Sequence, residues 1–220
     1  MKNKKVFVSW SGGKDSALSL YLAKKRGADV RFLLNMMNST GRVSRSHGIT
    51  PYLMKKQAKA VGISLIQKRT SWNRYEENFK KMLSNLKKNG IEGGIFGDID
   101  TQEHLDWVER VCRESGLDAH LPIWNSPREK LMKEFIRTGF RAVIVVLNSD
   151  YLGEEWLGRE LDNDFLRDIK KCENVDICGE KGEFHTFVYD GPVFNKPVEF
   201  VFGKKVVWNQ YRFLELKKQV

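Results

Sequence analysis

The chain has 220 residues, of which 41% are hydrophobic and 30% are charged, with 38 Lys and Arg against 28 Asp and Glu. This composition excludes a disordered chain, and three cysteines exclude a disulfide scaffold, so we expect a folded protein in the reducing cytoplasm. No apolar run is long enough to predict a membrane span or a signal peptide.

The net charge of +10 is unevenly distributed. Residues 1–90 hold 20 basic and 4 acidic residues, residues 91–124 hold 2 and 8, and residues 125–220 hold 16 of each. Many of the cations stand as lysine doublets, which is typical of solvated helix faces. The alternative is a positive field that attracts a polyanion such as ATP, pyrophosphate, RNA or an acidic protein. The charge alone does not choose between these interpretations.

Strands and helices alternate through the first 124 residues. Strands are predicted over 5–10, 29–37, 63–68, 94–97 and 119–123, and helices over 16–26, 51–61, 75–88 and the stretch after Asp100. Asp100 and Glu103 have the spacing of a capping box, so Asp100 is expected to cap that last helix. The alternation is typical of βαβ units and predicts an α/β fold with a doubly wound parallel sheet. Ligands of such sheets bind at the carboxyl ends of the strands.

The chain changes character at Trp124-Asn125-Ser126-Pro127. Beyond it we expect a helix over 128–138, a strand over 141–147 and an acidic helical stretch over 154–171. Further strands are predicted over 184–190, 197–202 and 205–215, with a turn at Gly203-Lys204 joining the last two. This mixture predicts a smaller α+β domain, and therefore a division into residues 1–124 and 125–220.

The segment Ser11-Gly12-Gly13-Lys14-Asp15-Ser16 lies directly between the first predicted strand and the first predicted helix. Glycines allow a tight turn and a close approach to a ligand, and a helix N-terminus offers unpaired N–H groups. Lys14 adds positive charge, so the segment predicts a phosphate-binding loop. It is not a Walker A loop, because Val8 and Asp15 stand where that motif has glycine and Ser or Thr.

The order SGGKDS is that of the PP-loop of ATP pyrophosphatases, which cut ATP between its α and β phosphates. Three more segments extend the likeness: Phe96–Asp100, Leu117–Trp124 and Cys178–Phe194. Together they resemble the diphthine–ammonia ligase family of diphthamide synthesis, a branch of the PP-loop ATPases with an adenine nucleotide alpha-hydrolase-like fold. The chain departs from the archaeal and eukaryotic pattern at His104, Leu105, Trp107 and His185, which is typical of a bacterial-type branch.

The resemblance implies an ATP-dependent ligase with its active site between an ATP-binding domain and a substrate-binding domain. A diphthine-like carboxylate would be adenylated, and ammonia would then displace AMP to give an amide. The implied cofactors are ATP and Mg²⁺. The implied partners are ammonia and an acceptor carboxylate, for which a protein such as elongation factor 2 is a candidate. A homodimer is a further candidate partner, no membrane is expected, and nucleic acid is left open.

The expected site residues follow from the matched motifs. Nucleotide binding is expected at Ser9, Ser11, Gly12, Gly13, Lys14, Asp15, Ser16, His47, Gly97 and Asp98. Substrate binding is expected at Glu180, Gly182, Glu183, His185, Thr186 and Asp190, with Phe184 and Tyr189 as aromatic neighbours for a quaternary ammonium group. Catalytic roles are expected for Lys14, Asp15 and His185, and Mg²⁺ binding for Asp15. Each position has a structural alternative, such as a helix first-turn acid for Asp15 or a satisfied core histidine for His185.

Two other functions remain open. A PP-loop enzyme that modifies tRNA would use the basic half of the chain to hold RNA. Sulfur-transferring enzymes of that kind commonly use paired cysteines, whereas Cys172 and Cys178 form no CxxC motif. The other alternative is a module that binds ATP without catalysis.

Overall fold

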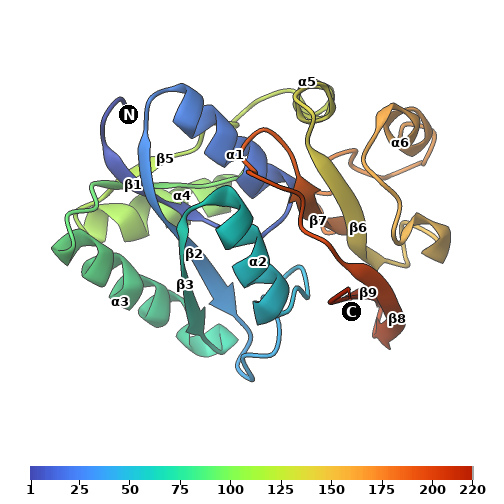
Figure 1. Cartoon of the computed structure of the whole chain (residues 1–220), viewed down its shortest axis with the longest axis horizontal. Helices are drawn as coiled ribbons and strands as arrows, with labels where there is room; N and C mark the ends of the chain where they lie inside the picture. The colour runs from blue at the N-terminus through green and yellow to red at the C-terminus, as the bar shows by residue number, and fades with distance from the viewer. Residues whose placement is uncertain (220) are drawn as a thin grey trace.

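A parallel sheet forms the N-terminal half of the computed structural model, which describes residues 1–219 (Figure 1). Its strands are β1 (Lys5–Ser9), β2 (Asp29–Met37), β3 (Ser64–Arg69), β4 (Gly93–Ile95) and β5 (Asp118–His120). All pairs are parallel and the order is β3-β2-β1-β4-β5, which confirms the predicted doubly wound sheet. The strand order reverses between β1 and β4, so the crevice lies at the carboxyl end of β1, where residues 11–16 begin.

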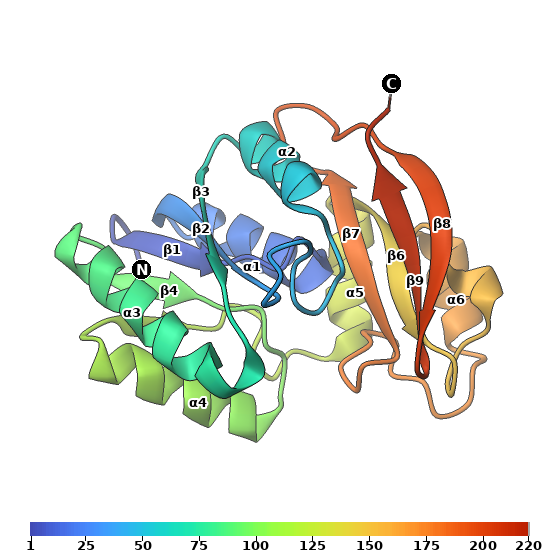
Figure 2. The same ribbon diagram turned by 90° about the horizontal axis from the view of Figure 1, so that it is seen from below.

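Helices cover both faces of this sheet. They are α1 (Lys14–Lys25), α2 (Pro51–Val61), α3 (Tyr75–Lys88), which follows the short 3-10 helix η1 (Trp72–Arg74), and α4 (Gln102–Glu114). Val8 on β1 shares one apolar cluster with α1 and α2, whereas its neighbour Phe7 shares a second with α3 and α4. This division follows from the alternation of side chains along a strand. Figure 2 shows α3 and α4 together, away from α2.

The starts of α2 and α4 show where a capping signal in the sequence predicts the helix correctly and where it does not. The Thr50 hydroxyl accepts the N–H of Leu53 at 3.4 Å, and Gly62 ends α2 with a φ of 74°. The predicted cap at Asp100 is wrong, because α4 begins after Thr101, which makes no side-chain cap bond. Both carboxylate oxygens of Asp100 instead accept hydrogen bonds from Arg128. A bidentate pair with the charged guanidinium is stronger than a single hydrogen bond from a backbone N–H.

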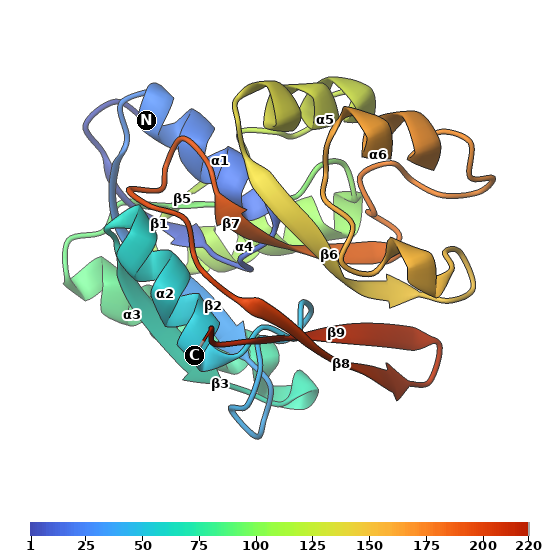
Figure 3. The same ribbon diagram turned by 45° about the vertical axis from the view of Figure 1, so that its right-hand side comes forward.

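A four-stranded antiparallel sheet with helices beside it forms the C-terminal half, in agreement with the predicted α+β class. Its strands are β6 (Arg141–Asn148), β7 (Phe184–Asp190), β8 (Val201–Trp208) and β9 (Tyr211–Lys217), in the order β7-β6-β9-β8. Two helices, α5 (Arg128–Arg137) and α6 (Asn163–Ile169), and the short 3-10 helix η2 (Glu154–Trp156) complete it. Figure 3 shows α5 and α6 side by side, apart from the β8–β9 hairpin.

The acidic helical stretch predicted over 154–171 is confirmed only in part, because η2 and α6 lie within it but residues 157–162 are not helical. Gly158 has a φ of 83°, which stops the short helix η2. The chain then bonds along β6, since the N–H of Ile144 donates to the Arg159 carbonyl at 3.0 Å. This edge of β6 is open because β9 pairs only with its last residues, 146–148. The backbone of these residues therefore forms hydrogen bonds with the edge of β6 in place of the hydrogen bonds of a helix.

The turn predicted at Gly203-Lys204 is also wrong. Strand β8 continues through these residues with a register shift between Phe202 and Lys205. The chain reverses instead between Trp208 and Tyr211, and Asn209 there has a φ of 51°. Two-residue hairpin turns need this left-handed backbone, which Asn tolerates better than most residues.

One apolar core joins the two sheets. A single cluster contains Val8 and Leu18 from the N-terminal half with Phe135 and Phe187 from the C-terminal half. The division at residue 124 therefore stays a prediction. Among residues 1–219, no helix combines the length and the apolar character that a membrane crossing needs.

Candidate functional site

The loop of residues 11–16, the phosphate loop, runs from the end of β1 into the first turn of α1. Gly12 has a φ of 83°, and a Cβ atom there would lie 2.6 Å from Oε1 of Gln57. A Cβ atom on Gly13 would overlap the His47 ring. The Ser11 hydroxyl accepts the N–H of Gly13 at 3.2 Å, and the Ser16 hydroxyl donates to the Gly13 carbonyl at 3.0 Å. The loop is therefore tight and preformed at a helix N-terminus.

Lys14 is buried beside this loop. Its Nζ donates to Oδ2 of Asp15 at 2.7 Å and lies 5.6 Å from the centre of the Phe184 ring. Burial opposes the charge on Lys14, but Asp15, Cys178 and Glu180 offset it and raise the lysine pKa. Burial raises the pKa of the Asp15 carboxyl, and the Lys14 ammonium opposes that shift. The result is a desolvated positive charge at the helix N-terminus, suited to an incoming phosphate.

The edge strand β7 of the other sheet contacts the phosphate loop directly. The Thr186 hydroxyl accepts the N–H of Lys14 at 3.0 Å, and the N–H of Val188 donates to the Gly12 carbonyl at 2.9 Å. The Thr186 carbonyl lies 2.7 Å from Nδ1 of His47. Thr186, expected at the substrate, thus also supports the phosphate loop.

Gln57 on α2 connects these parts, and the sequence reasoning missed it. Its side chain is fully buried; Nε2 donates to the carbonyls of Gly12 at 2.9 Å and Val188 at 2.6 Å. Its Oε1 accepts the indole N–H of Trp10 at 3.1 Å. The available signal was position, because Gln57 falls on the apolar face of α2 with Leu53 and Met54. A polar residue at such a position must find buried partners.

A cavity, the reaction cavity, lies between the phosphate loop and the loop before β7. It is lined by Lys14, Asp15, Ser46, His47, Gly97, Asp98, His104, Gly179, Glu180, Gly182, Phe184, His185 and Thr186. Residues 178–183, the acceptor loop, close one side of it. Segments expected to bind nucleotide and segments expected to bind substrate therefore meet in one place.

Acidic groups gather in this cavity near Lys14. Burial raises the pKa of Glu180 to about 7; the charge of Asp15 adds to the shift and that of Lys14 opposes it. Asp98 accepts at 3.1 Å from Nδ1 of His104, and this hydrogen bond raises the pKa of His104. His104 is not among the site residues expected from the sequence. The spacing of Asp98 and His104, on either side of a helix start, was the available signal.

Gly97 is required by a close approach. A Cβ atom on it would lie 2.9 Å from the carbonyl carbon of Asp15 and 3.0 Å from the backbone nitrogen of Ser16. The segment after β4 can therefore touch the start of α1 only with glycine at this position. Gly97 thus brings Asp98 to the phosphate loop.

Two histidines that line the cavity lie against each other with their rings tilted by 42°. The ring centres of His47 and His185 are 4.8 Å apart. Burial lowers the pKa of His47 to about 4 and that of His185 to about 3, with the charge of Lys14 adding to both shifts. Both rings are therefore neutral near pH 7. A base with so low a pKa accepts protons poorly, which favours a hydrogen-bonding role for His185 over the expected role as a base.

The structure does not bring Glu183, Tyr189 or Asp190 to the cavity. Glu183 is fully buried, and its carboxylate accepts the backbone N–H groups of Asp176 at 2.7 Å and Lys181 at 2.9 Å. It therefore shapes the acceptor loop from behind. The Tyr189 hydroxyl bonds to Glu160, and Asp190 ends β7, roughly 20 Å along the strand from its start.

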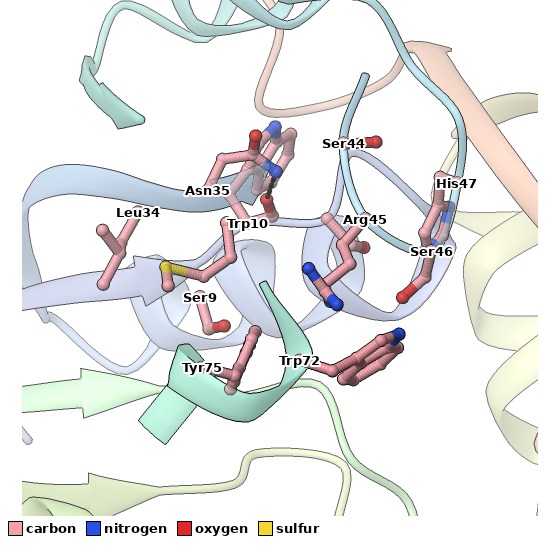
Figure 4. A pocket seen from close by; sticks show the side chains of 12 residues that line it. Ser9, Trp10, Leu34, Asn35, Ser44, Arg45, Ser46, His47, Trp72 and Tyr75 are labelled. Carbon is pink, nitrogen blue, oxygen red and sulfur yellow. Dashed lines mark hydrogen bonds between the residues drawn. The ribbon is translucent and has the colours of Figure 1, made fainter. Parts of the chain in front are cut away.

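A second cavity, the aromatic cavity, adjoins the first and shares Ser46 and His47 with it (Figure 4). The expected residues Ser9 and Ser11 line it, together with Trp10, Leu34, Asn35, Met36, Ser44, Arg45, Trp72 and Tyr75. The Arg45 guanidinium lies 3.8 Å from the centre of the Trp72 ring. Within residues 1–219, Nε of Arg45 is buried without a hydrogen-bond partner. Arg45 and Trp72 were not predicted as site residues, because they come from two separate segments, one between β2 and α2 and the other after β3.

The residues fit a magnesium ion carried by a nucleotide better than a dedicated metal site. In the part of the chain that the structure describes, no cluster of three or more His, Cys, Asp or Glu side chains could hold a metal. Two carboxylates, Asp15 and Asp98, line the reaction cavity beside the phosphate loop. Mg²⁺ typically takes one or two protein carboxylates together with substrate phosphates and water.

Comparison with known proteins gives matches over nearly the whole chain. Residues 4–119 match the family model of the diphthamide synthase N-terminal domain, and residues 127–220 match that of the diphthamide synthase C-terminal domain. The chain is 26% identical to the diphthine–ammonia ligase of Homo sapiens, over 86% of this chain and 79% of that one. It is 27% identical to that of Schizosaccharomyces pombe, over 88% of this chain but 36% of that longer one.

One solved structure aligns with nearly the whole chain. It is the predicted subunit of a tRNA methyltransferase from Methanocaldococcus jannaschii, with 17% identity and a TM-score of 0.45 over 98% of this chain and 100% of that chain.

Proposed function

The chain belongs to the diphthamide synthase family, and on this premise we propose that it is an ATP-dependent ligase joining a carboxylate to ammonia. Relatives named diphthine–ammonia ligase, about a quarter identical over most of the chain, support a ligase. The observation that carries the proposal is the single cavity between the phosphate loop and the acceptor loop. An enzyme that activates one group with ATP and transfers it to another needs both sites in contact.

In this proposal ATP spans the two adjoining cavities. Its β and γ phosphates lie on the phosphate loop, against the start of α1 and Lys14. Its adenosine lies in the aromatic cavity, where Trp72 and Tyr75 offer ring surface and Arg45 offers unused donor capacity. Asp15 and Asp98 would hold the Mg²⁺ that accompanies the phosphates, and this ion would neutralise charge on the leaving pyrophosphate.

The reaction proceeds in two balanced steps. An oxygen of the acceptor carboxylate attacks the α-phosphorus, the bond to the β-phosphate oxygen breaks, and pyrophosphate leaves. Ammonia then adds to the carbonyl of the acyl-adenylate and loses a proton, and AMP departs with the former carboxylate oxygen. The phosphate loop and Lys14 stabilise the negative charge that develops on pyrophosphate.

The acceptor loop provides the residues that bind the second substrate in this proposal. Glu180 lies in the cavity with Phe184 and Asp98, a combination that suits a cation through charge and ring contact. A quaternary ammonium group such as that of diphthine has this chemistry, and so has ammonium. His185, neutral and half-buried, would orient the acceptor by a hydrogen bond.

The acceptor proposed for a first test is diphthine on elongation factor 2, in accordance with the relatives' name. We place the reaction in the cytoplasm, which is compatible with the free thiols of Cys112, Cys172 and Cys178. The homodimer expected from the sequence stays a prediction.

Product analysis tests this function. The protein is incubated with Mg²⁺, ammonium, diphthine-bearing elongation factor 2 and ATP labelled at the α-phosphate. The expected products are labelled AMP and pyrophosphate, formed only when the acceptor is present. Release of ADP and inorganic phosphate would contradict the proposal, and ATP binding without turnover would favour the non-catalytic alternative.

A further inference from the structure

One long segment of the chain contains no acidic residues, and the proposed reaction does not use it. Residues 30–75 contain nine Lys and Arg and no Asp or Glu. They form most of β2, then α2, β3 and η1, and β3 is the edge strand of the parallel sheet. Figures 1 and 2 show α2 and β3 as neighbours. One side of the molecule is therefore built from a segment that carries only positive charge.

Seven of the nine cations of this segment are exposed to solvent, and Arg45 and Lys68 are half-buried. On α2 the exposed positions are Tyr52, Lys55, Lys56 and Lys59, while the other positions pack inward or are half-buried. The Arg69 side chain lies against Gly41, which places it beside Arg42, and both arginines are exposed. We name Arg42, Lys55, Lys56, Lys59 and Arg69 the basic surface. Throughout residues 1–219, no side chain of this surface forms an ion pair.

The opposite face of the same sheet differs in this respect. On α3, Lys80 pairs with Glu76 at 2.7 Å and with Glu114 at 2.5 Å, and Lys81 pairs with Glu77. Arg110 on α4 pairs with Glu76 at 2.7 Å. The Lys80-Lys81 doublet there is neutralised by neighbouring acids, whereas Lys87 and Lys88 at the end of α3 form no ion pair among residues 1–219. The α2 side differs because its segment of chain contains no acidic residue that could pair with its lysines.

The basic surface lies next to the proposed active site without being part of it. The buried side of α2 supports the phosphate loop through Gln57, and the loop before α2 carries Ser46 and His47 into both cavities. The exposed side of α2 alone extends roughly 16 Å. ATP held in the two cavities cannot reach this surface, so its cations are available to a larger anion.

We propose that the basic surface docks an acidic face of the protein that carries the acceptor carboxylate. This rests on the proposed function, because a ligase that activates a carboxylate requires an acceptor bearing one, which proteins offer and RNA does not. Charge complementarity brings the partner to the mouth of the reaction cavity. Tyr52, 38% exposed on the same face of α2, supplies an aromatic contact within the surface.

A triple variant with a matched control tests the surface in catalysis. Lys55→Ala, Lys56→Ala and Lys59→Ala remove three charges from α2, and Lys81→Ala, Lys87→Ala and Lys88→Ala remove three from α3. With diphthine-bearing elongation factor 2, the α2 variant should lower kcat/KM for the acceptor about tenfold and leave KM for ATP unchanged. The α3 variant should stay within about twofold of the unaltered protein. Equal effects of the two variants would overturn the proposal.

A binding experiment separates this inference from the proposed function, since it needs no turnover. Fluorescein-labelled oligoglutamate and oligouridylate of equal charge are titrated into each protein at low and raised salt. Oligoglutamate should bind the unaltered protein and the α3 variant but bind the α2 variant about tenfold more weakly, with reduced salt dependence. If elongation factor 2 is not turned over, this result still supports the surface while the proposed acceptor fails. Binding that depends on α2 for oligouridylate alone would overturn the proposal and indicate a nucleic-acid partner.

Discussion

The phosphate loop and the acceptor loop face each other across the reaction cavity but are built in opposite ways. The phosphate loop takes its shape from its own glycines and the first turn of α1. The acceptor loop depends on Glu183, which binds two backbone N–H groups of that region, and on an ion pair of Asp176 with distant Arg128. The turn and the helix start of the phosphate loop are therefore encoded by neighbours in sequence, although Gln57, Thr186 and Val188 support it from other elements, whereas the acceptor loop has no such local motif.

The strongest test of this difference removes the charge of the phosphate loop. Lys14→Met keeps the apolar stem in its buried position but should lower the rate of pyrophosphate release about a thousandfold. The melting temperature should change little in comparison with that loss of activity. Lys24→Met, at the exposed end of the same helix, is the control and should retain full activity. An active Lys14→Met protein would show that the loop does not hold the phosphates.

The next test breaks the link between the two sides. Gln57→Met leaves the Val188 carbonyl and the Trp10 indole N–H without their buried partner, which should cost about 2–3 kcal/mol of unfolding free energy. The Gly12 carbonyl keeps only its bond from Val188, so KM for ATP should rise more than kcat falls. Denaturant unfolding and steady-state kinetics measure both. Lys88→Met, exposed at the end of α3, should change neither, and equal behaviour of the two variants would exclude the positioning role.

The acceptor side has a pH signature of its own. Because the pKa of Glu180 is about 7 in the folded protein and near 4.5 when exposed, the folded state binds the proton more tightly. The stability that Glu180 gains from this tighter proton binding is fully present below pH 4.5 and is lost as pH rises through 7. Between pH 4.5 and 8 the unaltered protein should lose about 1–3 kcal/mol relative to Glu180→Gln. A pH-independent difference in urea unfolding would show that Glu180 ionises normally.

The smallest effect is expected outside both loops. Glu76 on α3 bonds to Arg110, Lys80 and the indole N–H of Trp107, and these contacts lower its pKa. Its side chain is 38% exposed, so solvent screens the interactions. Glu76→Gln should cost less than about 1 kcal/mol and leave kcat and KM unchanged. A large loss of activity would mean that the α3–α4 side contributes to the site.

The difference between the two loops also explains what the sequence could predict. Residues 11–16 carry their turn, helix start and charge within six positions, so both the loop and its chemistry are visible in the sequence. The parallel sheet follows in the same way, because strand and helix periods alternate regularly through 124 residues. The capping of α2 by Thr50 and Gly62 is equally local.

The predictions that failed depend on residues far away in the chain. Asp100 has the local spacing of a cap, but Arg128 binds it instead. Residues 158–161 lie inside the stretch predicted to be helical, but they form hydrogen bonds along the open edge of β6 instead. Gln57, Arg45 and Trp72 were missed because their meaning comes from partners on other elements. Glu183 has the type of a substrate-binding acid and becomes a buried support only through the fold around it.

Transfer of oxygen from the acceptor carboxylate tests the central claim most directly. Diphthine-bearing elongation factor 2, labelled with oxygen-18 in the acceptor carboxylate, is turned over with ATP and ammonium, and the nucleotide is examined by mass spectrometry. If the carboxylate is adenylated in the reaction cavity and ammonia then displaces AMP, each AMP should carry one labelled oxygen. Label in inorganic phosphate, or AMP formed without label, would contradict the account.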